Sequence, residues 1–249
     1  MKRKKILVSL SAIAMTTLIA GCTAGTDSAK SNTTDQTTEK VDVNTLDLPQ
    51  LSNDIAENEV AADIVTSLGT ISVKLFPEQA PKAVENFMTH ARDGYYNDVK
   101  FHRVIKDFMI QTGDPRGTGM GGESIFGEEF APEISNQLYH INGALAMART
   151  GGPVTDKTQG SQFYIVQNDQ DVSGQLSKGN VNYPDKIKEA YKKGGTPFLD
   201  AEYSVFGQVI SGLDIVKQIG ELETVAQDAP AKDFRIEKIN IIKDLPETK

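Results

Sequence analysis

From residue 60 onward, the chain consists mainly of short apolar segments of strand length that are separated by turn residues. The clearest pair is 62–66 and 70–75, where apolar and polar residues alternate on either side of Gly69. Such alternation predicts strands with one buried face, and the short turn between them predicts a hairpin. Further strands are expected at 99–105, 108–113, 130–134, 143–149, 161–167, 203–210 and 234–242.

Two segments show helical spacing instead. Pro81 suits the first turn of a helix, and Gly94 suits its end. The apolar residues between them lie at helical spacing and form one face, which consists of Val84, Phe87, Met88 and Ala91. A second helix is expected at 212–219. Many short strands with two helices predict a mainly β fold, a closed antiparallel barrel capped at its ends.

Residues 168–197 lack this succession of short apolar segments because they are polar and rich in glycine. Ile187 and Tyr191 are four residues apart, which is compatible with a short helix at 184–193. Loops of this length in a compact domain are usually functional or disordered.

The N-terminus predicts a lipoprotein signal peptide over residues 1–21. Four basic residues precede an apolar stretch, 6–20, that is shorter than the roughly 20 residues a membrane-spanning helix needs. The sequence Leu18-Ile19-Ala20-Gly21-Cys22 resembles a bacterial lipobox, which implies cleavage before Cys22 and a lipid on its sulfur. Ordinary secretion with an unmodified Cys22 is the alternative. Cys22 is the only cysteine, so disulfides and cysteine-based metal sites are excluded.

Residues 22–58 are polar and predict a flexible tether from the lipidated Cys22, although the leucines in its second half favour local packing. The globular domain is expected at 59–249, with the insertion at 168–197. The formal net charge of −8 becomes more negative once the basic N-terminus is removed, which excludes nucleic acid as a partner. The lipid rather than charge would therefore hold the chain at a membrane, and stable anchoring takes more than one acyl chain.

Two neighbouring strand segments carry the most informative polar residues. Phe101-His102-Arg103-Val104-Ile105 contains Arg103, and Phe108-Met109-Ile110-Gln111-Thr112-Gly113-Asp114 contains Gln111. A fixed cation and an amide beside apolar side chains suit a shallow hydrophobic pocket. Taken alone, these residues equally fit a surface arginine on a strand whose apolar neighbours belong to the core.

Further motifs follow these in order, namely 122–130, Gly143-Ala144-Leu145-Ala146-Met147-Ala148-Arg149, Gly160-Ser161-Gln162-Phe163-Tyr164-Ile165, Phe198-Leu199-Asp200 and Val205-Phe206-Gly207. Together they resemble the cyclophilin-type peptidyl-prolyl isomerases over roughly residues 60–243, apart from 168–197. The resemblance implies an eight-stranded closed antiparallel barrel capped by two α-helices. It also implies catalysis of rotation about the peptide bond that precedes proline, with no cofactor and no metal.

The resemblance assigns Arg103 to the catalytic arginine. It assigns substrate-binding positions to Phe108, Met109, Gln111, Ala148, Arg149, Tyr164, Phe198, Leu199 and Tyr203. Three of these depart from the usual pattern: Tyr164 replaces a phenylalanine, Tyr203 a histidine and Phe198 a tryptophan. That tryptophan contributes to cyclosporin binding in the family, so sensitivity to cyclosporin is in doubt. The insertion lies between Tyr164 and Phe198, which places it near the pocket rim. There it would shape access or contact client chains, and the alternative is a passive solvated loop.

Two weaker signals are set aside. The glycines of 117–122 match a dinucleotide-binding pattern, but Pro115 precedes them and no helical pattern follows, so a surface loop is expected. The three histidines lack the spacing of a metal site. His102 neighbours Arg103 on a strand, so it should point to the opposite face, into the barrel interior.

We therefore expect a monomeric isomerase that acts on proline-containing segments of secreted or cell-surface proteins as they fold. It would be lipid-anchored through Cys22 to the outer face of a bacterial cytoplasmic membrane. The alternative is a non-catalytic module that binds proline segments, or a holdase chaperone, built on the same pocket.

Overall fold

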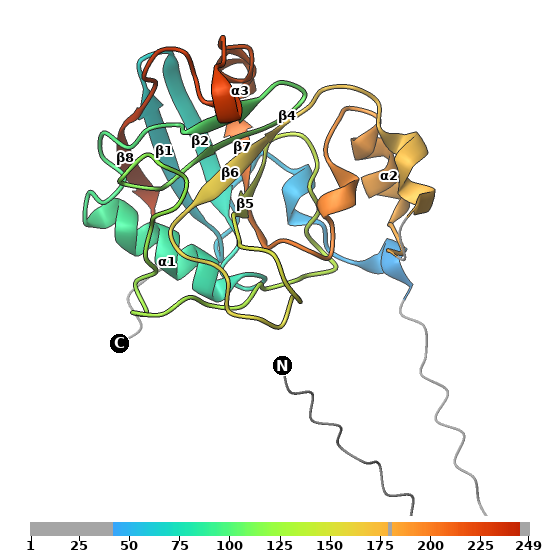
Figure 1. The fold of residues 1–249 in the computed structure, drawn as a ribbon. Helices are drawn as coiled ribbons and strands as arrows, with labels where there is room; N and C mark the ends of the chain where they lie inside the picture. The colour runs from blue at the N-terminus through green and yellow to red at the C-terminus, as the bar shows by residue number, and fades with distance from the viewer. Residues whose placement is uncertain (1–41, 179–180, 245–249) are drawn as a thin grey trace, which may run out of the picture. The chain divides into compact units, whose positions relative to one another are not determined.

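The computed structural model describes residues 42–178 and 181–244 (Figure 1). Its α-helices and strands, in chain order, are β1 (Val60–Thr66), β2 (Gly69–Leu75), α1 (Pro81–Arg92), β3 (Arg103–Ile105), β4 (Phe108–Thr112), β5 (Ala144–Met147), β6 (Phe163–Gln167), α2 (Asp185–Tyr191), β7 (Val205–Ser211), α3 (Leu213–Gly220) and β8 (Ile236–Lys243). Short 3₁₀ turns include Val43–Thr45, Pro49–Leu51, Ser173–Lys178, Pro197–Leu199 and Ala226–Asp228. Cys22 and the expected signal peptide lie outside the described residues.

The eight described strands form one curled antiparallel sheet in the order β3-β4-β6-β5-β7-β2-β1-β8. The predicted hairpin is confirmed, with Val60 opposite Leu75 and Thr66 opposite Gly69. The sheet is a half-barrel rather than the closed barrel expected, because its edge strands β3 and β8 share no ladder. They meet only through the isolated bridge between Lys100 and Arg235, just outside both strands. That bridge is held by two backbone hydrogen bonds of 2.9 Å, from the N–H of Phe101 to the carbonyl of Phe234 and from the N–H of Ile236 to the carbonyl of Val99.

Helices α1 and α3 lie at opposite ends of the curled sheet (Figure 1). The predicted apolar face of α1 is confirmed, since Val84, Phe87, Met88 and Ala91 all belong to the main hydrophobic core. The Glu133 carboxylate accepts the backbone N–H groups of Lys82 (3.1 Å) and Ala83 (3.0 Å). It therefore caps a helix whose own N-cap residue is alanine.

Two further expectations about elements were wrong. The segment 130–134 is not a strand and makes only the bridge from Phe130 to Gln159. Pro132 removes a ladder donor there, and the N–H of Glu133 bonds the Ser204 hydroxyl instead. The described residues contain three α-helices rather than two, because the helix-compatible spacing inside the insertion does form α2.

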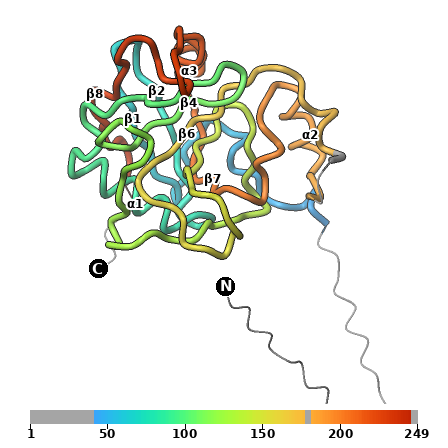
Figure 2. Tube along the Cα trace, viewed as in Figure 1, coloured from blue at the N-terminus to red at the C-terminus, as the bar shows by residue number. Residues whose placement is uncertain are grey.

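The insertion builds a small hydrophobic core of its own. Its buried members from the insertion are Val172, Tyr183, Ile187 and Tyr191, which pack with Tyr139 and Ile141. Leu48 packs against the same cluster, and Figure 2 shows the blue N-terminal segment beside the orange insertion. The body of the insertion is therefore anchored on the domain.

Residues 42–58, expected as the second half of a tether, make specific contacts with the domain. Gln50 is buried, and its side chain bonds both the N–H (2.6 Å) and the carbonyl (2.9 Å) of Tyr139. Lys74 on β2 is also buried and contacts both carboxylate oxygens of Glu59 at 3.1 Å and the carbonyl of Asp54 at 2.9 Å. These contacts join the segment that precedes β1 to the sheet.

Candidate active site

The pairing of β3, β4, β6 and β5 sorts side chains onto two faces of the sheet. In register, Val104 lies opposite Ile110, Ile110 opposite Ile165, and Ile165 opposite Leu145, and all four belong to the main core. The neighbouring positions therefore point to the other face. That face carries Ile105, Met109, Tyr164 and Ala146, which belong to a second apolar cluster.

The same register sets Arg103 beside Gln111, and Gln111 beside Tyr164. Directly opposed residues on an antiparallel pair have adjacent side chains. A cation, an amide and an aromatic ring are thus aligned across three strands. The two-residue turn between β3 and β4 fixes this alignment, with Asp107 at a positive φ of 57°.

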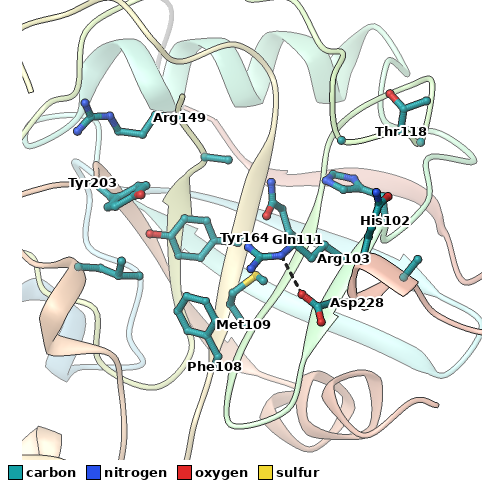
Figure 3. A pocket seen from close by; sticks show the side chains of 16 residues that line it. His102, Arg103, Phe108, Met109, Gln111, Thr118, Arg149, Tyr164, Tyr203 and Asp228 are labelled. Atoms are coloured by element: carbon teal, nitrogen blue, oxygen red, sulfur yellow. Dashed lines mark hydrogen bonds and ion pairs between the residues drawn. The ribbon is translucent and has the colours of Figure 1, made fainter. Parts of the chain in front are cut away.

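These side chains line an open cavity of about 730 Å³ (Figure 3). Its lining includes nine of the ten residues expected at the site, namely Arg103, Phe108, Met109, Gln111, Ala148, Arg149, Tyr164, Leu199 and Tyr203. Phe198 is the exception. It is 63% exposed and packs against Phe108 with the rings tilted by 37° and their centroids 5.5 Å apart, which places it beside the cavity rather than in its lining.

Arg103 is held at the cavity by an ion pair on one side of its guanidinium. Its Nε lies 3.4 Å from Oδ2 of Asp228 (Figure 3). The bond uses one of the five N–H donors that an arginine carries. Gln111 is fixed from the other side, because its amide nitrogen donates to Gln162 (3.0 Å), which in turn donates to the carbonyls of Gly119 and Gly121.

The Arg149 side chain takes a different direction from Arg103. Its guanidinium bonds the carbonyls of Glu202, Gly152 and Pro153 and lies 5.7 Å from the ring centroid of Tyr203. Through these contacts the Arg149 side chain stabilises the loop around residues 152–153.

His102 corrects one expectation, because it lines the cavity instead of the barrel interior. It lies under the glycine loop, where a Cβ on Gly119 would come within 3.1 Å of its ring. Gly119 also has a φ of +75°, so glycine is favoured there. The expectation failed because His102 precedes β3, which begins at Arg103, and strand alternation does not extend to it.

The segment 227–229 also lines the cavity beside Arg103, and the sequence did not predict it. Gln227 and Asp228 both have positive φ values, 64° and 59°. The only sequence signal was the turn-like Asp228-Ala229-Pro230, which does not indicate what the turn approaches.

Asp114 organises the glycine loop. Its buried carboxylate accepts the N–H groups of Arg116, Thr118, Gly119 and Gly121 at 2.9–3.1 Å, and the Thr118 hydroxyl at 2.9 Å. Burial acts to raise the pKa of Asp114, but these hydrogen bonds outweigh it and hold the pKa below its usual value.

This lowered pKa predicts a pH dependence. The loop contribution to stability is complete above the usual carboxyl pKa of about 4 and is lost as the pH falls through the lower folded-state value. Asp114→Asn should remove this dependence and cost about 1–3 kcal/mol at neutral pH, because backbone donors lose an acceptor. Unfolding free energies measured from pH 2 to 7 test this, and parallel curves for both proteins would contradict it.

Metal and membrane signals are absent from the described part of the chain. Residues 42–178 and 181–244 contain no cluster of three or more potential metal ligands among His, Cys, Asp and Glu. None of the helices described there has the length and apolar character needed to cross a bilayer.

A family model described as cyclophilin type peptidyl-prolyl cis-trans isomerase/CLD matches residues 61–241. The chain belongs to the cyclophilin family. It is a cyclophilin-type peptidyl-prolyl cis-trans isomerase, EC 5.2.1.8. Proline-containing peptides are the substrates that this membership implies.

Relatives support the assignment over the same region. A Staphylococcus saprophyticus protein provisionally named as a peptidyl-prolyl cis-trans isomerase is 47% identical over 197 residues, which cover 78% of this chain and 98% of that protein. A Staphylococcus aureus protein of the same name is 46% identical over 197 residues, covering 78% and 97%.

Solved cyclophilin structures share the fold. A cyclophilin-type isomerase of Cryptosporidium parvum superposes with a TM-score of 0.60 at 33% identity, covering 75% of this chain and 99% of that one. A second structure of that protein, obtained in the presence of the dipeptide Ala-Pro, gives a TM-score of 0.59 at 33% identity, covering 74% and 99%. The half-barrel described above is thus a cyclophilin fold.

Proposed function

We propose that the cavity is the isomerase site and that Arg103 acts there without covalent chemistry. Amide resonance gives prolyl rotation a barrier of about 18–20 kcal/mol. In the twisted state the prolyl nitrogen becomes pyramidal and basic, so a fixed donor binds it better than either planar state. A 10⁵-fold acceleration would require about 7 kcal/mol of such differential binding.

The observation that carries this proposal is the placement of one guanidinium over an apolar floor. Met109 and Tyr164 are buried, and Phe108, Leu199 and Tyr203 are packed against the same cluster. A proline ring matches these surfaces in character, and Arg103 and Gln111 stand beside them on paired strands. The Asp228 contact leaves further N–H donors of Arg103 for the substrate.

The first test is the cis-to-trans rate of a short Ala-Pro peptide with the isolated domain. Acceleration by the wild type supports the proposal, and a folded wild type without acceleration contradicts it. In that case the same pocket would serve as a proline-segment binder or holdase, which suppression of aggregation would reveal.

We further propose that the clients are secreted or cell-surface proteins and that the chain is lipid-anchored outside the cytoplasmic membrane. The support is the basic and apolar N-terminus followed by the lipobox-like Leu18–Cys22. Uncatalysed prolyl isomerisation takes tens to hundreds of seconds and can limit the folding of such clients. Labelled palmitate should enter the wild type and not Cys22→Ser, and equal labelling would refute the anchor.

Phe198 predicts weak inhibition by cyclosporin. A phenylalanine has no hydrogen-bond donor, whereas the tryptophan usual at this position carries an indole N–H and a larger ring. Since Phe198 is largely exposed beside the cavity, Phe198→Trp fits without repacking the core. We expect the variant to bind cyclosporin about tenfold more tightly, the effect of one such interaction. Inhibition curves for both proteins check this, and unchanged inhibition would contradict it.

A further inference from the structure

Four buried groups connect the insertion to the floor of the cavity. The Tyr191 hydroxyl, at the end of α2, donates to Oδ2 of Asp200. Oδ1 of Asp200 lies 2.8 Å from both the backbone nitrogen and Nδ1 of His140. Nε2 of His140 lies 3.1 Å from the hydroxyl of Tyr164, which lines the cavity.

The carboxylate of Asp200 only accepts hydrogen bonds, so Nδ1 of His140 directs its proton at Asp200. In the neutral form of the ring, Nε2 is then an acceptor, and the Tyr164 hydroxyl donates to it. Its proton is directed away from the cavity, and burial raises its pKa well above the usual tyrosine value.

Each member of this chain is enclosed. Tyr191, His140 and Tyr164 are 0%, 1% and 4% exposed. Hydrogen bonds in such surroundings are strong and restrict the groups that make them. Tyr203, also in the cavity lining, packs edge-on to both the His140 and Tyr164 rings. The chain thus sets the position of two aromatic walls.

We infer that Tyr191 is a positioning residue for the prolyl pocket and acts through Asp200 and His140 on Tyr164. The inference rests on the cavity being the isomerase site proposed above. It gives the insertion a role that does not require it to line the cavity, as none of its described residues does. The insertion core fixes the position of Tyr191, and Tyr191 in turn fixes Tyr164 in the floor of the cavity through Asp200 and His140.

A double-mutant cycle of Tyr191→Phe and Tyr164→Phe tests this inference. Both substitutions keep the ring and remove only the hydroxyl. Coupled sites are non-additive. Each single variant should lower kcat/KM for an Ala-Pro peptide about threefold to tenfold. The kcat/KM of the double variant should be no lower than that of the less active single variant. Additive losses, or no loss in Tyr191→Phe, would overturn the inference.

Tyr139→Phe is the matched control for a merely structural effect. Tyr139 belongs to the same insertion core, but its hydroxyl donates to the backbone carbonyl of Asn136. The kcat/KM of Tyr139→Phe should stay within about twofold of the wild-type value when the two proteins are equally stable, as expected for a site outside the coupled chain. If Tyr139→Phe lowers kcat/KM as much as Tyr191→Phe does, the effect is one of general destabilisation and the inference is overturned.

A spectroscopic measurement separates this inference from the proposed function. Nitrogen chemical shifts of the His140 ring should show the Nδ1–H tautomer in the wild type and change in both Tyr191→Phe and Tyr164→Phe. A wild type that shows these shifts but no acceleration would refute the proposed function alone. If the wild type accelerates isomerisation but the His140 chemical shifts are the same in Tyr191→Phe as in the wild type, the positioning role alone is refuted.

Discussion

Arg103→Ala is expected to lower kcat/KM for an Ala-Pro peptide by about 10²–10³, the loss seen when one fixed donor to a transition state is removed. The folded state should change little, because the Arg103 side chain is 41% exposed and its ion pair with Asp228 is long, at 3.4 Å. The loss should appear mainly in kcat, since the donor acts on the twisted amide rather than on the planar substrate. Protease-coupled peptide kinetics measure it.

Arg103→Lys is the matched control. It retains the charge but replaces the rigid fork with a flexible point charge. Partial recovery would show that charge contributes, and no recovery would show that geometry decides. A variant Arg103→Ala that keeps full activity would contradict the assignment, and retained suppression of aggregation in an inactive variant would show that binding and catalysis are separate properties of the pocket.

Glu59→Ala is expected to destabilise the domain by about 3–5 kcal/mol, because it leaves a buried ammonium without its counter-charge. The Lys74 side chain is 1% exposed, and both Glu59 oxygens lie 3.1 Å from its Nζ. The carbonyl of Asp54 would remain as a partner and would only partly compensate. Denaturant unfolding followed by circular dichroism measures the change.

The paired replacement Lys74→Met with Glu59→Leu is the control. Removing both charges together removes their desolvation cost, so the double variant should recover most of the lost stability. A single Glu59→Ala variant as stable as the wild type would show that Lys74 finds water or another partner, which would contradict the buried-pair interpretation. Activity should be retained by the double variant, because neither residue lines the cavity.

Local pattern was sufficient to predict the first hairpin and the first helix of the domain. Alternation marked β1 and β2, and helical spacing marked α1. Arg103 and Gln111 were expected beside one pocket because they lie on neighbouring strand segments, and the strand register makes them direct neighbours. The role of each pocket residue, in contrast, came from family resemblance and stays a prediction.

The features that sequence missed depend on contacts between distant segments. Closure of the barrel depends on how far β3 and β8 extend, which alternation does not report. The approach of Asp228 to Arg103 spans more than a hundred residues and is set by a turn with two positive φ values. The expected strand at 130–134 failed for a similar reason, since Glu133 bonds α1 and Ser204 instead of a neighbouring strand.

The contacts of Gln50 have a consequence for where this protein begins as a cooperative unit. The family match starts at residue 61, yet Gln50 is 4% exposed and saturates the main-chain groups of Tyr139 within the insertion core. The contacts of the domain therefore extend on the N-terminal side of the family match. We expect a protease to spare residues 42–60 as it spares the strands, and a fragment cut at the homology boundary would expose the insertion core to water.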